Sequence, residues 1–226
     1  MRDETSASNG DAITAVTSSG IQRNGRGRML RDLAAAFAFS IASLAGGPAA
    51  AQATRFEIDP DHLSIGFLVS HIGYANVLGM FRAATGSYSY DEKTGALSAI
   101  RIEVDTASVF TNHRKRDDHL KGPDFLNSGE FPKMSFTAGS ARRTGDKGFE
   151  ISGNLELLGR SLPMTLQATM NKLSEYEMGT FRKPYVMGVS ARGSFKRSAY
   201  GMTYGIDNGW VGDDVSMIIE FEARRR

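Results

Sequence analysis

The sequence contains no cysteine among its 226 residues. Disulfide bonds, thiol catalysis, thiolate zinc sites and cysteine-ligated iron–sulfur clusters are therefore excluded. Proline is also scarce, with 6 residues against 25 glycines, which favours a turn-rich fold over a helical bundle. Hydrophobic residues make up 41% of the chain and charged residues 23%, which is typical of a globular protein.

The chain has little excess charge of either sign. Its 27 Lys and Arg residues oppose 25 Asp and Glu residues, which gives a net charge of +2. A nucleic-acid-binding protein usually carries a larger basic excess, so we expect no nucleic-acid partner. No nucleophile elbow, P-loop or dinucleotide fingerprint occurs, and no H-x-x-H or H-E-x-x-H spacing for a metal. We therefore predict no catalytic residues, no metal and no cofactor.

The first 53 residues differ in composition from the rest of the chain. Residues 1–27 are polar, a cluster of arginines follows, and residues 33–44 carry no charge. Ala51-Gln52-Ala53 then supplies the small-x-small pattern that signal peptidase requires. We predict a leader and secretory signal peptide over residues 1–53 and one domain over residues 54–226. Translation from Met29 instead of Met1 stays open as an alternative.

Alternation of apolar and polar residues recurs along the predicted domain. Ile100, Ile102 and Val104 alternate with charged neighbours, and this period of two indicates β-strands. The same pattern covers residues 65–71, 81–90, 134–138, 149–157, 164–170, 189–195 and 215–221. Short glycine-bearing loops at 91–95, 145–148 and 159–161 favour antiparallel neighbours. About eight antiparallel strands predict an all-β barrel or sandwich, interrupted by a short helical segment near residues 113–127.

Small residues occupy several positions in phase with the apolar strand faces. An eight-stranded barrel is wide enough to hold one small ligand, and small side chains leave room inside it. The alternative is a packed core with methionine as filler. The small in-phase residues are Ala138, Gly153, Ala168, Ala191 and Gly193.

Several motifs resemble the YceI-like family. The opening motif is Asp59-x-x-His62-x-x-Ile65-x-Phe67-x-Val69-x-His71, followed by Gly79-Met80-Phe81. The central one is Arg116-Asp117-x-His119-Leu120, then Asp124-Phe125-Leu126 and Phe131-Pro132-x-Met134-x-Phe136. Later ones are Gly153-Asn154-Leu155 with Gly159, and Arg197-Ser198-Ala199-Tyr200-Gly201-Met202. The resemblance runs in order from Phe56 through Ala223.

The resemblance implies a lipocalin-like, eight-stranded antiparallel barrel that is exported to the periplasm. Members of the family bind a polyisoprenoid or another long-chain amphiphile and are not established as enzymes. The sequence departs from the family pattern at four positions. Leu63 replaces a frequent Ser, Leu126 a second Phe, Ala199 the usual Asp and Tyr200 the usual Phe. The change at Leu126 is expected to alter the pocket mouth.

We interpret a set of in-phase residues as the lining for a bound tail, with a plain core as the alternative. His71 shares the phase of the inward residues before it, and its polar tip is a candidate for contact with a ligand head group. The predicted ligand-binding residues are Phe67, Val69, His71, Phe81, Ile102, Met134, Phe136, Leu155, Leu166 and Ala168.

Arg116, Asp117 and His119 lie in the charged helical segment, and we interpret them as a structural network over one barrel end. Two alternatives stay open. One is an acid–base or metal-assisted enzyme that uses His71, Asp117 and His119. The other is a ligand-free, stress-related scaffold whose barrel is filled by its own side chains.

The leading hypothesis is a periplasmic protein that encloses a lipid for transport or storage. Its expected partner is a long-chain isoprenoid, which includes the tail of a quinone, or a fatty amphiphile. Transient contact with a membrane surface and a homodimer are further partner hypotheses. The basic end Arg224-Arg225-Arg226 is a candidate for such contact, with a solvated chain end as the alternative.

Overall fold

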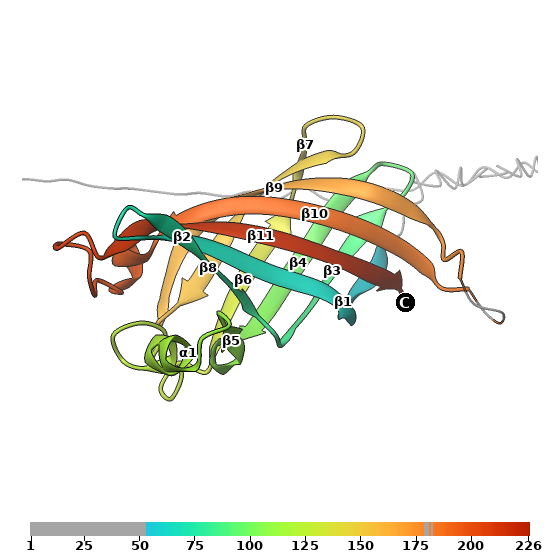
Figure 1. The fold of residues 1–226 in the computed structure, drawn as a ribbon. Coiled ribbons are helices and arrows are strands. Elements are labelled where there is room, and N and C mark those ends of the chain that lie inside the picture. Colours follow the sequence, from blue (N-terminus) through green and yellow to red (C-terminus); the bar gives the residue numbers. More distant parts are fainter. Residues whose placement is uncertain (1–52, 179–180, 182) are drawn as a thin grey trace, which may run out of the picture. The chain divides into compact units, whose positions relative to one another are not determined.

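The computed structural model describes residues 53–178, 181 and 183–226, and the predicted leader lies outside this range except for Ala53. Strands dominate the described residues (Figure 1). The elements in chain order are β1 (Thr54–His71), β2 (Ala75–Phe81), β3 (Ala84–Asp91), β4 (Ala96–Asp105), η1 (Thr106–Ser108), β5 (Val109–Phe110), α1 (Arg114–Lys121), β6 (Lys133–Ser140), β7 (Arg142–Arg143), β8 (Gly148–Leu157), β9 (Arg160–Glu175), β10 (Tyr185–Lys196), η2 (Arg197–Tyr200) and β11 (Val211–Arg225).

Eight strands close into an antiparallel barrel, which confirms the predicted fold class. The ring runs β1-β3-β4-β6-β8-β9-β10-β11 and returns to β1. The closing pair places Ile65 opposite Ile219 and Phe67 opposite Met217. Because the sheet closes on itself, these eight strands leave few backbone edges free to pair with another chain.

Strand β1 is long, and along one edge it pairs with two different strands in succession. Its first residues pair with β3, and Ile65–His71 pair with β2. The register against β11 shifts between Ile58 and Leu63, so the strand carries an irregularity there. The predicted continuous strand over residues 81–90 is wrong, because β2 ends at Phe81 and β3 begins at Ala84.

The predicted alternation is confirmed in the strongly periodic strands. In β9, Met164, Leu166 and Ala168 are buried while their neighbours Thr165 and Gln167 are exposed. Buried apolar residues from all eight strands form one hydrophobic cluster. Leu158 and Gly159 join β8 to β9 with φ angles of 51° and 70°, as a two-residue hairpin turn requires.

Helix α1 lies at one end of the barrel (Figure 1). His113 caps it, since its Nδ1 accepts a hydrogen bond from the backbone N–H of Arg116 at 3.2 Å. The helix ends at Lys121, before Gly122 and Pro123, because proline cannot continue a helix. The predicted helical segment near residues 113–127 is therefore a helix of two turns followed by a tight turn.

The three C-terminal arginines form ion pairs with acidic residues near the first half of β1 and the turn after β3. Arg224 contacts Asp59 at 2.6 Å, Arg225 contacts Glu92 at 2.9 Å and Arg226 contacts Glu57 at 2.6 Å. Each of these half-exposed arginines thus has an acidic partner in the same chain, so the basic end is not a free tail. None of the helices in the described part of the chain has the length and apolar character to cross a membrane.

Candidate ligand cavity

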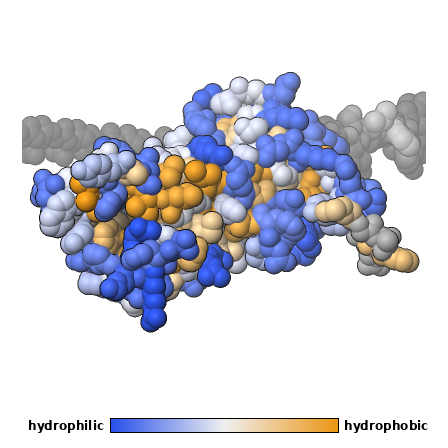
Figure 2. Space-filling model, viewed as in Figure 1, coloured by the Kyte–Doolittle hydropathy of each residue, from blue (hydrophilic) through white to orange (hydrophobic). Residues whose placement is uncertain are grey.

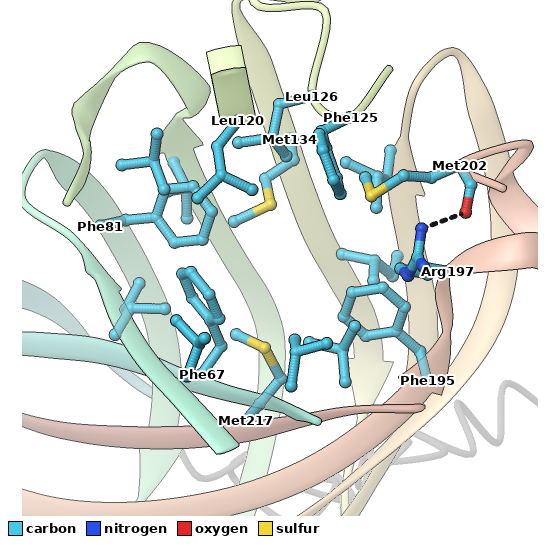
Figure 3. Close-up of a pocket in the computed structure, with 18 of the residues that line it drawn as sticks. Phe67, Phe81, Leu120, Phe125, Leu126, Met134, Phe195, Arg197, Met202 and Met217 are labelled. Carbon is cyan, nitrogen blue, oxygen red and sulfur yellow. Dashed lines mark hydrogen bonds between the residues drawn. The ribbon is translucent and has the colours of Figure 1, made fainter. Parts of the chain in front are cut away.

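The barrel contains a cavity of about 460 Å³ at the end covered by α1. Its wall is almost wholly apolar (Figure 3). The strands supply one side of the lining, and the segment after β5 supplies Leu120, Phe125 and Leu126. Nine of the ten residues predicted from the sequence line this cavity: Phe67, Val69, His71, Phe81, Ile102, Met134, Phe136, Leu155 and Leu166. The ligand-free scaffold hypothesis requires a lumen filled by side chains, and the cavity shows that this lumen is not filled.

Ala168 lies elsewhere. It lines a second, apolar cavity of about 40 Å³, which Tyr88, Tyr90 and Phe149 also line. Three residues line both cavities and form the boundary between them: Ile102, Leu166 and Ile219. Alternation placed Ala168 on the inner face, but alternation does not give the depth of a residue along the barrel.

Glycines in the barrel wall keep the large cavity open. Phe67 lies directly opposite Gly79, and a Cβ atom built on Gly79 would meet the ring at 2.7 Å from both Cε atoms. A Cβ on Gly193 would likewise lie 2.7 Å from Cδ2 of Leu166. Each glycine thus forms a socket that receives a neighbouring large side chain. The side chains lie against the wall, and the centre of the lumen stays free.

Aromatic contacts join the two sides of the cavity mouth. The ring of His119, in α1, meets Phe125 and Tyr204 edge-on with centroids 5.0 Å apart in each case. Nε2 of His119 also lies 2.8 Å from a carboxylate oxygen of Asp124. These contacts tie the helical segment to the loop that precedes β11, so the mouth has a defined frame.

Arg197 holds that loop in place and is 1% exposed. Its guanidinium donates hydrogen bonds to four backbone carbonyl oxygens at 2.7–2.9 Å, those of Gly212, Met202, Tyr204 and Val211. Figure 3 shows the bond to Met202. Burial lowers the pKa of Arg197, and the nearby Asp213 carboxylate opposes this shift. With four of its five N–H groups committed, Arg197 fixes the loop and has little capacity left for a ligand.

The predicted network of Arg116, Asp117 and His119 is placed at the same barrel end. Arg116 and Asp117 meet through Thr111. Oδ1 of Asp117 accepts hydrogen bonds from Thr111, at 2.7 Å from the backbone N and 2.5 Å from Oγ1. Arg116 donates to Oγ1 and to the carbonyl oxygen of Thr111, both at 2.7 Å. His119 takes part separately, through Asp124.

Polar lining groups gather at the mouth. His71 is the last residue of β1 and is exposed, so it lies at the cavity entrance and not deep inside the barrel. Ser70 and Arg116 line the same cavity. A ligand head group at the mouth would therefore meet an imidazole, a hydroxyl and a guanidinium.

The three residues of the enzyme hypothesis are not brought together. His71 and His119 line the cavity, whereas Asp117 is buried against Thr111 and is not part of the lining. Within residues 53–178, 181 and 183–226, no three His, Asp or Glu side chains are placed to hold a metal ion.

Sequence reasoning missed much of the mouth and part of the wall. Met217 and Ile219 carry the same alternation as the predicted residues and could have been included. Tyr204 and Trp210 lie in a loop without periodicity, so no strand pattern marks them. Leu126 does line the cavity, as the family departure at this position suggested.

Comparison with known proteins agrees with this architecture. Residues 56–223 match the family model described as a YceI-like domain. Protein YceI of Salmonella arizonae is 33% identical over 186 residues, which cover 81% of this chain and 94% of the relative. Protein YceI of Salmonella heidelberg matches with the same values.

Solved structures show the same fold. Burkholderia cenocepacia BcnA superposes with a TM-score of 0.63 at 18% identity, over 73% of this chain and 98% of that one. The Campylobacter jejuni YCEI protein gives 0.63 at 24% identity, over 70% and 90%. A polyisoprenoid binding domain from Saccharophagus degradans, implicated in plant cell wall breakdown, gives 0.52 at 12% identity, over 77% and 100%.

Proposed function

Since the chain belongs to the YceI-like family, we propose that its barrel encloses the apolar tail of a long-chain amphiphile. The observation that carries this proposal is the cavity of about 460 Å³ with its apolar wall. Ligand sites commonly measure about 300–1,000 Å³, so the cavity has the size of a binding site. The polyisoprenoid binding by the Saccharophagus degradans domain is consistent with an isoprenoid as the ligand.

The cavity volume sets the length of tail that fits. If each non-hydrogen atom of the tail takes roughly 30 Å³, the volume of one water molecule in the liquid, the cavity of about 460 Å³ holds about 15 such atoms. At about −0.3 kcal/mol per atom, the enclosed part contributes roughly −4.5 kcal/mol, which corresponds to sub-millimolar affinity. Tighter binding therefore requires further contacts at the mouth. A longer chain would extend beyond the mouth, because Ile102, Leu166 and Ile219 close the inner end.

The polar groups indicate the orientation of the ligand. The inner wall is apolar, whereas Ser70, His71 and Arg116 lie at the mouth. We therefore expect the tail to enter first and the head group to stay at the mouth. Arg116 uses Nε and Nη2 on Thr111 and retains further N–H groups for a head-group oxygen.

Cellular setting and physiological role belong to the same proposal. The arginine cluster, the uncharged segment at 33–44 and Ala51-Gln52-Ala53 support export to the periplasm, with a mature chain that begins at Thr54. In that compartment the barrel would shield an isoprenoid or quinone tail from water during transport or storage. The protein would bind its ligand without transforming it.

A chain-length series tests the proposal. Isoprenoid alcohols and fatty acids of increasing length would compete with an environment-sensitive fluorescent fatty acid for the purified protein. We expect affinity to rise with length until the cavity is filled, at about 15 non-hydrogen atoms, and to level off beyond it. No displacement by any chain would contradict tail binding. Chemical conversion of a bound ligand would favour the enzyme hypothesis.

A further inference from the structure

Four large hydrophobic residues at the cavity mouth are exposed, and we call them the mouth rim. They are Ile72 at 48%, Tyr74 at 89%, Tyr204 at 39% and Trp210 at 51%. Ile72 and Tyr74 belong to the turn between β1 and β2, and the other two belong to the loop before β11. Aromatic residues with a polar tip are the types that collect where a membrane meets water.

Hydrogen bonds hold the two parts of the mouth rim together. The backbone N–H of Ile72 donates to the carbonyl oxygen of Trp210 at 3.0 Å. The backbone N–H of Val211 donates to the carbonyl oxygen of Gly205 at 2.9 Å, and Arg197 fixes the carbonyl of Tyr204. The exposed side chains therefore project from a supported frame.

The mouth rim borders the cavity, and an apolar strip lies on the outside of the neighbouring strands. Ile72, Tyr204 and Trp210 also line the cavity. The strip continues along the outer face of β2 and β5 through Leu78, Met80 and Phe110. Figure 2 shows hydrophobic side chains gathered over the part of this face where Figure 1 places β2 and β11. Clustering of this kind marks an interaction surface, whereas scattered single residues do not.

Positive charge lies beside the same mouth. Helix α1 exposes Arg114, Lys115 and Arg116, and Arg116 lines the cavity. Its two acidic residues offset part of this charge: Asp117 is buried and bonds to Thr111, and Asp118 lies 3.8 Å from Arg114, so Lys115 and Arg116 supply the remaining positive charge. Such a helix complements the anionic head groups of a lipid bilayer.

We propose that the mouth rim docks on the surface of a lipid bilayer. This proposal rests on the proposed function, because the docked cavity would open toward the apolar phase that supplies its ligand. A tail that emerges from the mouth meets Ile72, Tyr204 and Trp210, so it passes between cavity and bilayer without crossing water. A second copy of the chain on the same surface would instead cover the entrance.

The chain provides its own probe, because Trp210 is its only tryptophan. Vesicles of phosphatidylcholine, with and without phosphatidylglycerol, would be added to the purified protein. We expect a blue shift of the Trp210 emission, quenching by brominated lipid, and stronger binding when the anionic lipid is present. The rim variant combines Tyr74→Ser in the mouth rim with Leu78→Ser in the adjoining strip, and neither residue lines the cavity. It should bind vesicles at least tenfold more weakly while its tail binding in solution stays unchanged.

Met178→Ser is the matched control, since Met178 is 70% exposed but lies between β9 and β10, at the opposite end of the barrel. All variants carry the same residues 1–53, so any binding by the leader is common to them. The proposal is overturned if vesicles leave the Trp210 spectrum unchanged, or if Met178→Ser weakens vesicle binding as much as the rim variant. A dimer in sedimentation velocity with no vesicle binding would assign the rim to a second copy. Failure of tail binding in solution would instead refute the proposed function.

Discussion

Replacing Gly79 with alanine should reduce the ligand space without unfolding the barrel. The added Cβ would lie 2.7 Å from two ring carbons of Phe67, so the ring must leave the wall. The lumen is the open direction, because Phe67 lines the cavity and packs against Phe81 with centroids 5.6 Å apart. Gly79 has no positive φ angle, so alanine fits its backbone conformation.

The expected loss of affinity follows from the ring size. A phenyl ring that moves into the lumen displaces about six non-hydrogen atoms of a tail, which at about 0.3 kcal/mol each removes roughly 2 kcal/mol of binding free energy. Affinity should therefore fall about 20- to 30-fold. The free energy of unfolding should change by less than about 1 kcal/mol. The entropy that alanine removes from the unfolded chain offsets the strain of a displaced rotamer.

Gly66→Ala is the matched control for this experiment. A Cβ on Gly66 would meet nothing nearer than 3.6 Å, so the same chemical change leaves the lumen untouched. Adding Phe67→Leu to Gly79→Ala should restore part of the lost affinity, because the smaller side chain needs less of the socket. Competition with a fluorescent fatty acid gives the affinities, and urea denaturation gives the stabilities.

Either of two results would contradict the displacement of Phe67 into the lumen. Unchanged affinity in Gly79→Ala would mean that the ring does not enter tail space. An equal loss in Gly66→Ala would mean that any alanine in this region disturbs the barrel.

Three further predictions concern stability. Asp117→Ala removes the charge-assisted bonds to Thr111 and should lower the free energy of unfolding by about 1.5–3 kcal/mol; an unchanged urea midpoint would contradict the anchoring role. Ala168→Phe should overpack the small cavity at a cost of about 1–3 kcal/mol and leave tail binding intact, and loss of binding at full stability would show that the tail reaches Ala168. The hydrogen bond with Asp59 raises the pKa of His62, although burial opposes this shift. Protonated His62 therefore stabilises the folded protein fully below the unfolded pKa of about 6.5, and this stabilisation is lost as pH rises through the folded pKa. Urea midpoints measured between about pH 6 and 8 should fall less in His62→Gln than in the parent, and equal slopes would exclude His62 as the source.

The inner face of the barrel could be predicted from alternation. Phe67, Met134 and Leu166 lie on that face because a strand turns every second side chain inward. Height along the barrel could not be predicted, because it depends on strand tilt and register. The positions of Ala168 at the small cavity and of His71 at the mouth were therefore not predicted, although both residues were assigned to the inner face.

The mouth was the part least visible in the sequence. Thr111 joins Arg116 and Asp117 through contacts that no local spacing encodes. Arg197 was visible only as part of a family motif, and its four carbonyl partners come from residues 202–212. Irregular loops of this kind are fixed by tertiary hydrogen bonds, so period-based reasoning does not reach them.

Native mass spectrometry of the exported protein tests tail binding most directly. We predict a mass above that of the chain from Thr54 to Arg226, with the excess released by denaturation and identified as one long-chain amphiphile per barrel. Gly66→Ala should retain this ligand and Gly79→Ala should retain less of it. A parent protein that carries no lipid, and takes up none when long-chain isoprenoids or fatty acids are supplied, would contradict the account.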